Sequence, residues 1–307
     1  MKNKSNRRER EKNLFGYKLL LPSTVLFLFI SVYPLLNGIW MSFTNRNLMR
    51  PEQTKFVFLE NYIKLFRDSE FLGSLAFTLV YTTLVVLISY VIGLALALAL
   101  NRDIHGRAVY RTIFLLPWII PSVVAMTNWS WILNDQFGFI NTCLEKLHLI
   151  DHPVLFLADY RWIRPMVILI SVWKAMPFMM ITLLAGLQSV PQELYEAACM
   201  DGAGSIRMLR SITLPLIWPV SFISVTLNFI WTINNFENIW LLTGGGPNGH
   251  TFTLPIYSYY TAFYRQNLSY AAAIATTLII CMLLTAAVFL LIRRICSREG
   301  RKGEVSI

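Results

Sequence analysis

The chain has 307 residues, of which 55% are hydrophobic and only 14% charged, and its formal net charge is +10. Soluble domains typically carry about 25% charged residues, so this composition excludes an ordinary soluble domain and indicates a chain solvated mostly by lipid. The fold class that we expect is all-α, a polytopic membrane protein.

The basic residues concentrate at the two ends of the chain, beside apolar stretches. Anionic lipid headgroups account for this distribution. The chain lacks the basic–aromatic motifs of nucleic-acid-binding proteins, so we expect no nucleic-acid partner.

The chain divides into a basic tail at residues 1–16, a transmembrane domain at 17–292 and a second basic tail at 293–307. Six stretches have the roughly 20 apolar residues that a membrane span needs. These predicted spans are 17–43, 71–100, 109–133, 163–188, 216–242 and 268–292. The first span is longer than the core of a signal peptide and lacks a cleavage site, which indicates a retained helix.

Between the first two spans, the apolar residues of the segment that contains Leu59-Glu60-Asn61-Tyr62 and Phe66 recur at helical spacing. This pattern predicts a short amphipathic helix on the membrane surface.

The distribution of lysine and arginine predicts the orientation of the spans. With the N-terminus in the cytoplasm, the cytoplasmic segments hold 17 of the 27 Lys and Arg residues and the outer segments hold 9. Since cytoplasmic loops carry an excess of positive charge, we expect both termini in the cytoplasm.

The segment 189–215, between the fourth and fifth spans, is too polar to cross a bilayer and is patterned as a helical hairpin. Ser189 and Gln192 have the spacing of a capping box, which predicts that Ser189 caps the first helix. Gly202 and Gly204 supply the sharp reversal, because a Cβ would resist it.

The second helix of this hairpin is expected at about 205–213, with Pro215 beginning the next span. Small residues on its first helix allow the surface of another protein to approach closely. The alternative is an ordinary amphipathic connection that lies on the membrane surface.

The hairpin also carries a specific pattern. Glu196-Ala197-Ala198, Gly202 and Ile212-x-Leu214-Pro215 resemble the E-A-A-x3-G-x9-I-x-L-P loop in permease subunits of type I, binding-protein-dependent ABC importers. In that family the loop is a coupling helix seated in a groove of a separate ATPase subunit. The residues that the resemblance assigns to ATPase coupling are Glu196, Ala197, Ala198, Asp201, Gly202, Ala203, Leu214 and Pro215.

Other landmarks resemble the carbohydrate-uptake branch of these importers, in particular the first of its two paired permeases. They are Leu242-Thr-Gly-Gly-Gly-Pro247 with Thr251, Tyr33-Pro34, Leu59-Glu-Asn-Tyr62, Leu116-Pro117 and Gly138-x-x-Asn141. We expect the outer loop at Gly244, Gly245, Gly246 and Pro247 to face a solute-binding protein. Phe58, where a glycine is common, and the variable pair Cys199-Met200 are mild departures from the pattern.

The triglycine segment is not a phosphate-binding loop, because it is followed by proline and lacks the lysine that such a loop needs. No Walker-type sequence occurs in the chain. We therefore expect no ATPase activity and no cofactor in this chain, with ATP and Mg²⁺ bound by partner subunits. The His148-x-x-x-His152 spacing lies beside Pro153 in an outer loop, and we expect no metal site there.

Lys174 and Glu237 fall within predicted spans, where an ionised side chain costs about 2.5–3.5 kcal/mol. Our hypothesis is that the two either pair or face a common aqueous vestibule. The alternative for Lys174 is snorkelling or bonding to backbone oxygens.

Amide and indole side chains near these charges have the chemistry to line a sugar pathway, since amides bind hydroxyls and indole faces stack on sugar rings. The candidate pathway residues are Trp173, Lys174, Asn228, Trp231, Asn234, Asn235 and Glu237. The alternative for each is interhelical hydrogen bonding or exposure to lipid.

The resemblance implies a permease subunit in the cytoplasmic (inner) membrane of a bacterium or archaeon, which translocates a sugar or sugar-like solute. Its implied partners are a second, homologous permease, two ATPase subunits, an extracytoplasmic solute-binding protein, the bilayer and the sugar. Two alternatives are a secondary carrier, for which Lys174 and Glu237 are the candidate coupling groups, and a membrane scaffold or signalling protein.

Overall fold

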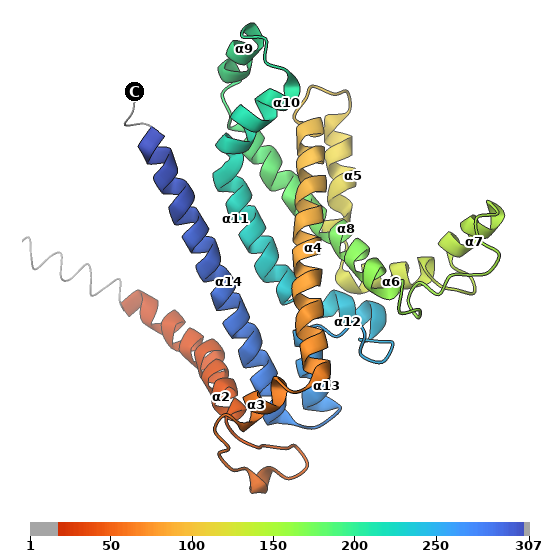
Figure 1. The fold of residues 1–307 in the computed structure, drawn as a ribbon, viewed down its shortest axis with the longest axis vertical. Coiled ribbons are helices and arrows are strands. Elements are labelled where there is room, and N and C mark those ends of the chain that lie inside the picture. The colour runs from red at the N-terminus through yellow and green to blue at the C-terminus, as the bar shows by residue number, and fades with distance from the viewer. Residues whose placement is uncertain (1–17, 304–307) are drawn as a thin grey trace, which may run out of the picture. The chain divides into compact units, whose positions relative to one another are not determined.

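The computed structural model describes residues 18–303, whose helices are joined by turns and loops that contain two isolated β-bridges, Thr44–Phe56 and Asn47–Asn267 (Figure 1). The chain forms two compact units. Unit 1 contains the residues up to Arg67 together with Ser258–Thr277, and unit 2 contains Asp68–Tyr257 together with the residues from Leu278 onward. The basic tail predicted at 1–16 lies outside the described residues.

Five helices are long and apolar enough to cross a membrane: Lys18–Ser42, Ser69–Leu100, Ile163–Gln188, Ser205–Ile233 and Leu268–Leu291. A sixth crossing is available only if the pair α5 (Arg107–Ile119) and α6 (Ser122–Ile132) counts as one span. The all-α polytopic fold is therefore confirmed.

The span predicted at 109–133, which Pro117 and Pro121 interrupt in the sequence, is formed by two helices, α5 and α6, that are bent by 94° where they meet. Pro121 lies at this break as the N-cap of α6. It has no backbone N–H and disfavours helical conformation in the residue before it, so the helix cannot run through.

The prediction of a fifth span at 216–242 is also displaced. The helix begins at Ser205 and continues through α10 (Ser205–Met208), the π-helical turn η3 (Leu209–Thr213) and α11 (Leu214–Ile233). Pro215 therefore lies inside the span, in the first turn of α11, rather than at its start. The segment after Ile233 forms a separate short helix, α12 (Glu237–Thr243).

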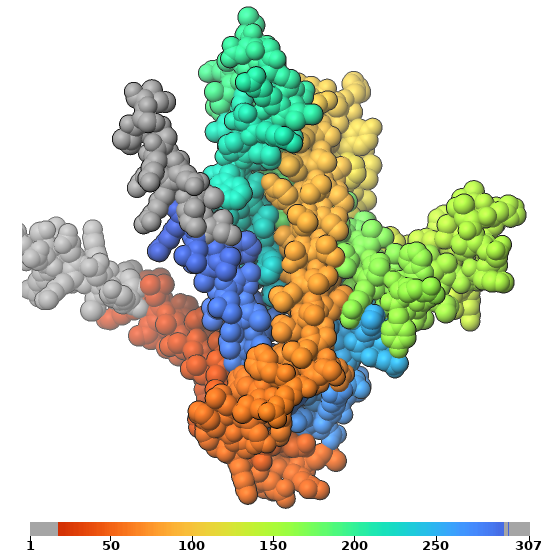
Figure 2. Space-filling model, in the orientation of Figure 1, coloured from red at the N-terminus to blue at the C-terminus, as the bar shows by residue number. Residues whose placement is uncertain are grey.

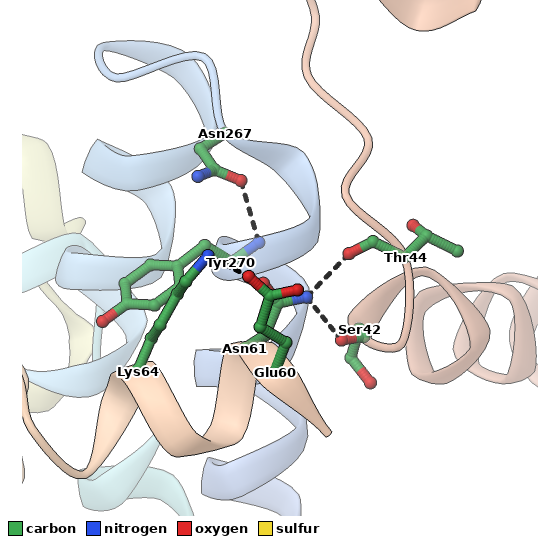
Figure 3. A network of polar contacts seen from close by, with 7 residues as sticks. All are labelled: Ser42, Thr44, Glu60, Asn61, Lys64, Asn267 and Tyr270. Carbon is green, nitrogen blue, oxygen red and sulfur yellow. Dashed lines mark hydrogen bonds and ion pairs between the residues drawn. The ribbon is translucent and has the colours of Figure 1, made fainter. Parts of the chain in front are cut away.

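Unit 1 is organised by side chains that bind backbone groups. Its first helix contains the π-helical turn η1 (Leu28–Val32) and ends as α2 (Tyr33–Ser42), and it is followed by the 3-10 turn η2 (Pro51–Gln53) and by α3 (Glu60–Leu65). The buried Asn61 donates to the carbonyl oxygens of Ser42 at 2.8 Å and Thr44 at 2.7 Å (Figure 3).

The predicted short helix is thus present as α3, and its Asn61 side chain binds the backbone at the end of α2. Glu60 and Lys64 form an i,i+4 ion pair at 2.7 Å on its outer side. Thr44 also bonds the hydroxyl of Ser269 at 2.7 Å, which joins this loop to the start of α14 (Leu268–Gly303).

Unit 2 is built around α4 (Ser69–Leu100), which packs along α8 (Ile163–Gln188), while α11 packs against both. Its apolar core consists of Val86, Ala97, Leu100, Met179, Met180, Leu183, Leu184, Leu187 and Ile217. The remaining elements are α7 (Phe139–Lys146), α9 (Gln192–Met200) and the first turn of α13 (Leu254–Phe263).

Three side-chain hydrogen bonds join the central helices of unit 2. Tyr81 of α4 donates to Ser171 of α8 at 2.9 Å. Asn228 of α11 donates to Ser89 of α4 at 3.1 Å. Tyr90 of α4 donates to Ser221 of α11 at 3.1 Å. Because lipid offers no alternative partners, such bonds hold helices together where apolar contact alone does not.

Candidate functional site: a projecting loop and a polar cavity

The hairpin predicted at 189–215 exists, but Ser189 does not cap its first helix. The Ser189 hydroxyl donates to the Gly186 carbonyl at 2.7 Å, so it closes the end of α8 instead. Pro191 is the N-cap of α9 and makes no side-chain capping bond. A proline at this position fixes the backbone in the extended region and lets a new helix begin at once, which overrides the capping-box spacing.

The reversal after α9 depends on Gly202. Its φ is +72°, in the left-handed region that L side chains disfavour. The amide of Ala203 donates to the carbonyl of Ala198 at 2.9 Å and closes the end of the helix. Gly204 has φ −73°, an ordinary value, so the predicted need for glycine holds at one of the two positions.

The helix α9 contains no buried residue, and all of its residues are exposed except the half-buried Tyr195 and Ala198. Glu196 and Ala197 are exposed, and Met200 is 89% exposed. Figure 2 shows the atoms of α9 standing clear of the adjacent ends of α4 and α5. Two side-chain contacts tie α9 to the helix that follows: the hydroxyls of Tyr195 and Thr213 bond at 3.0 Å, and the Cys199 thiol donates to the Met208 sulfur at 4.0 Å.

The predicted coupling residues therefore form two groups. Glu196, Ala197, Asp201 and Gly202 are exposed, and Ala198 and Ala203 are half-buried. Leu214 and Pro215 lie at the start of α11, where Leu214 packs against the core of unit 2. The projecting helix is thus connected to the membrane helices through a continuous α10–η3–α11 segment.

Unit 2 also holds a cavity of about 360 Å³. Its wall contains residues from α4, the α5–α6 bend, α8, α11 and α12. Four of the seven predicted pathway residues line it: Lys174, Asn228, Trp231 and Asn235. The other three, Trp173, Asn234 and Glu237, do not.

Lys174 binds the bend between α5 and α6. Its Nζ donates to the carbonyl oxygen of Ile120 at 2.6 Å and to that of Pro117 at 3.4 Å. The Pro117 oxygen would normally accept from the residue four positions later, but that residue is Pro121, which has no N–H. Lys174 supplies the missing donor, which is valuable where no water competes.

The direct pairing of Lys174 with Glu237 is not found among the described residues, and the alternative of bonding to backbone oxygens is what the structure contains. Glu237 is exposed at the first residue of α12. The prediction misplaced it because the break after Ile233 removes it from the fifth span.

Two amides in the cavity have different settings. Asn228 is buried, bonded to Ser89 and also to Thr232 at 3.2 Å, so it both lines the cavity and joins helices. Asn235 accepts from the backbone amide of Asn238 at 3.2 Å. The side-chain oxygen of Asn238 is buried without a hydrogen-bond partner.

Sequence reasoning missed several lining residues, among them Tyr81, Ser171 and Asn238. The first two lie in apolar spans, where isolated hydroxyls carry little signal. Asn238 could have been predicted from the sequence, because it follows the candidate residues Asn234 and Asn235 by a few positions.

The predicted outer loop at Gly244–Pro247 is closely packed. Gly245 is buried, and a Cβ there would lie 2.3 Å from the ring of Phe252. The hydroxyls of Thr243 and Thr251 bond each other at 2.8 Å across the loop, and Thr251 also donates to the Gly246 carbonyl at 3.0 Å. The loop therefore has a defined shape of its own.

The same loop is fixed to the first turn of α8 and to the segment just before it. Arg164 donates from Nε to the His250 carbonyl at 2.8 Å, and its guanidinium lies 4.5 Å from the ring centre of Phe77. The ring of Tyr160 meets His250 edge-on at 5.0 Å. Burial lowers the pKa of His250, the charge of Arg164 lowers it further, and a hydrogen bond with the Tyr160 main chain opposes them.

The fold and these sites can now be compared with known proteins. Residues 89–297 match the family described as the inner membrane component of binding-protein-dependent transport systems. The chain belongs to this family. The resemblance to ABC importer permeases is thereby confirmed, and the chain is a multi-pass transport subunit of an inner membrane, not itself an enzyme.

Several relatives of this permease align over most of its length. The trehalose/maltose transport system permease protein MalF of Thermococcus litoralis is 36% identical over 253 residues, covering 82% of this chain and 84% of that protein. The permease protein YcjO of Escherichia coli is 35% identical over 289 residues, covering 94% and 96%. The trehalose permease SugA of Mycobacterium tuberculosis is 32% identical over 275 residues, covering 90% and 87%.

A solved structure agrees as well. A bacterial alginate ABC transporter, in complex with a periplasmic protein bound to an alginate pentasaccharide, contains a chain that matches with a TM-score of 0.81 at 25% identity. The match covers 94% of this permease and 97% of that chain. The methionine transporter MetNI shares the fold at a TM-score of 0.54.

Proposed function

We propose that this permease passes a sugar through the cavity of unit 2, driven by ATP hydrolysis in separate subunits that engage the exposed helix α9. The observation that carries the proposal is the cavity itself. Its volume of about 360 Å³ lies within the range of small-molecule sites, and its wall combines aromatic side chains with amides and hydroxyls. Named sugar permeases among the relatives support the same substrate class.

The lining has the two chemical functions that a sugar requires. Asn235 and Asn238 offer amide groups, and the unpartnered oxygen of Asn238 is suited to accept from a hydroxyl. Trp231 and Trp118 offer indole faces to the apolar side of a sugar ring. Buried polar groups that lack partners favour a ligand that supplies hydrogen bonds over one that does not.

The segment 189–215 is proposed as the coupling loop. Glu196, Ala197 and Gly202 present small or charged groups on a helix that buries nothing within this chain. A second protein that covers α9 would therefore gain contact area without displacing internal packing. The expected complex contains two ATPase subunits that hold ATP and Mg²⁺ and a second, homologous permease.

On the other side of the membrane we propose that the packed loop at Gly244–Pro247 meets an extracytoplasmic solute-binding protein. A solved relative in complex with a periplasmic binding protein supports this part. In this orientation α9 and both termini face the cytoplasm.

The test is sugar uptake by the complete complex in proteoliposomes, with ATP inside and binding protein outside. We expect uptake that requires both, and loss of co-purifying ATPase when Glu196 is replaced by Lys. Glu145 is exposed in α7, outside segment 189–215. It provides the matched control Glu145→Lys, which should retain the ATPase. Uptake that proceeds without ATP would favour a secondary carrier and contradict the proposal.

The cavity is tested separately by Asn238→Leu and Asn235→Leu. Each removes one amide and should weaken uptake of the preferred sugar by about five- to tenfold, the effect of one hydrogen bond of about 1 kcal/mol or somewhat more. The exposed Asn234, outside the lining, supplies the control Asn234→Leu. Equal effects of all three substitutions would argue against a pathway through this cavity.

A further inference from the structure

The helix α5 is fastened to α8 by polar contacts near both of its ends. At its start, Arg107 and Arg111 lie one turn apart and face Gln188, the last residue of α8. With the amide oxygen of Gln188 turned toward these donors, it accepts from Arg107 at 2.7 Å and from Arg111 at 3.0 Å. This orientation is the one that chemistry requires, because the amide nitrogen would otherwise face donors only.

This contact is costly to lose. The Nε atoms of Arg107 and Arg111 are buried without a partner, and within the described residues the Gln188 oxygen is the acceptor that their guanidinium groups have. A charged donor deprived of its acceptor pays the full cost of desolvation. The start of α5 therefore follows Gln188 when Gln188 moves.

The other end of α5 is held by Lys174, which donates to the carbonyl oxygens of Pro117 and Ile120. That end is also part of the cavity wall, which includes Trp118, Ile119 and Ile120. On α8, Lys174 and Gln188 are 14 positions apart, about 21 Å at the helical rise. The two contacts therefore span most of the distance from the coupling loop to the cavity.

Between these contacts α5 is lightly held. Its single buried residue is Pro117, whereas α8 buries residues along its whole length against α4. Phe114 and Leu115 pack against the core but are only partly buried. Of the two helices, α5 is thus the one that can shift without disrupting the core of unit 2.

We propose that α5 transmits movement of the coupling loop to the cavity wall, with Arg107, Arg111 and Gln188 as positioning residues at one end and Lys174 at the other. The inference rests on the proposed function. Gln188 directly precedes the 189–191 connection to α9, so a force on α9 reaches it first. The guanidinium bonds pass the displacement to α5, and the Lys174 bonds keep the bend at Ile120 intact while α5 moves.

The experiment uses the complete complex, with the four native cysteines of this chain replaced by alanine. Single cysteines at Ser122, beside the bend, and at Ser171, on α8, report on two sides of the cavity. Their reaction with a water-soluble thiol reagent is measured with and without ATP, alongside uptake and ATP hydrolysis. Gln188→Met removes the acceptor and Lys174→Met removes the second contact.

We expect Gln188→Met to lower the ratio of uptake to ATP hydrolysis by about three- to thirtyfold, the range seen when coupling elements are altered. The ATP-dependent change at Ser122→Cys should disappear while the change at Ser171→Cys remains. Gln188→Glu should restore coupling, because a carboxylate accepts from both arginines. Matched controls are Arg102→Gln, in the exposed loop before α5, and Lys146→Met, in α7.

Two results would overturn the inference. One is an unchanged response at Ser122→Cys in the Gln188→Met and Lys174→Met proteins. The other is a parallel loss of uptake, ATP hydrolysis and complex yield that Gln188→Glu does not relieve, which would indicate a purely structural role. Failure of the proposed function is distinguishable, because the complex without these substitutions would then show no ATP-dependent uptake at all.

Discussion

Two connections of unit 2 differ in how far their residues are buried within the chain. In segment 189–215, which we propose as the coupling loop, α9 has no buried residue and is held to the next helix by the Tyr195–Thr213 and Cys199–Met208 side-chain contacts. The outer loop 244–253 buries Gly245 and is crossed by the Thr243–Thr251 bond. The first connection has little internal packing, whereas internal packing gives the second connection a defined shape.

The difference indicates two ways of meeting a partner. An exposed helix with an open turn at Gly202 keeps its apolar and charged groups accessible, and under the proposed function a second protein constrains its sequence. A loop packed on its own side chains presents a preformed surface, so its sequence is constrained by its own stability. Substitution of equivalent residues in the two loops should therefore affect different measurements.

The largest expected effect on stability is that of Gly245→Ala. The new Cβ would lie 2.3 Å from Phe252, and the residue has φ +85°. Overpacking costs about 1–3 kcal/mol and the left-handed backbone about 1–2 kcal/mol, so we expect a loss of about 2–5 kcal/mol. The thermal unfolding midpoint of the purified permease in detergent measures it.

Gly244→Ala is the matched control for this substitution. Its φ is +59°, but no heavy atom lies within 4 Å of the added Cβ. It should therefore lose only the backbone part, about 1–2 kcal/mol. Equal destabilisation by the two substitutions would mean that packing against Phe252 does not define the loop.

The next effect is that of Arg164→Met, which removes the bond to the His250 carbonyl and the contact with Phe77. A hydrogen bond from a charged group contributes about 1.5–3 kcal/mol, so we expect a loss of about 2–3 kcal/mol. Arg161→Met is the control, because the Arg161 side chain is 87% exposed. An equally large loss of stability in Arg161→Met would show that the positive charge near α8, and not the contact of Arg164 with the loop, stabilises the protein.

Sequence reasoning found the fold where the signal is local and continuous. The predicted spans at 71–100 and 163–188 agree closely with α4 and α8. It was less accurate where an apolar run is interrupted. Pro117 and Pro121 mark the interruption of the third span in the sequence but do not reveal its 94° bend, and the fifth span ends at Ile233 although hydropathy continues beyond it.

The candidate site shows the same limit. For Lys174 the sequence left two possibilities open, Glu237 and backbone oxygens, and the structure contains the second: Lys174 binds the carbonyl oxygens of Pro117 and Ile120. Such acceptors carry no residue-type signal. Asn228 and Asn235 were placed correctly because amides are rare in apolar helices and therefore visible.

A smaller effect on stability is expected for Gly202→Ala in the coupling loop. The backbone strain at φ +72° is about 1–2 kcal/mol, and no atom lies within 4 Å of the added Cβ. Because the loop is exposed, we expect the unfolding midpoint to fall no further than for Gly244→Ala. Co-purification of the ATPase should nevertheless be lost.

The matching substitution for the opposite loop is Gly244→Ala, which should retain the ATPase at wild-type amounts. If Gly202→Ala also kept its ATPase, the projecting turn would be shown to have no role in docking. The two loops would then differ only in their internal packing and not in how they bind a partner.

The smallest expected effect is a pH dependence of local stability. It should differ between the two loops because only one of them contains a histidine. Burial and Arg164 lower the pKa of His250 below its usual value of about 6.5. The unfolded loop therefore binds a proton more readily than the native loop. Its stability is complete above about pH 6.5 and declines as the pH falls toward the lowered pKa of the native loop.

Segment 189–215 contains no histidine, so this decline should be confined to the outer loop. Hydrogen exchange of amides in 244–253, corrected for the intrinsic pH dependence, should accelerate between pH 7 and 5, whereas exchange in 192–200 should not. His250→Gln should abolish the acceleration, since the main-chain carbonyl at that position still accepts from Arg164. Acceleration that persists in His250→Gln would assign the pH response to another group and leave the ring of His250 as a packing element against Tyr160.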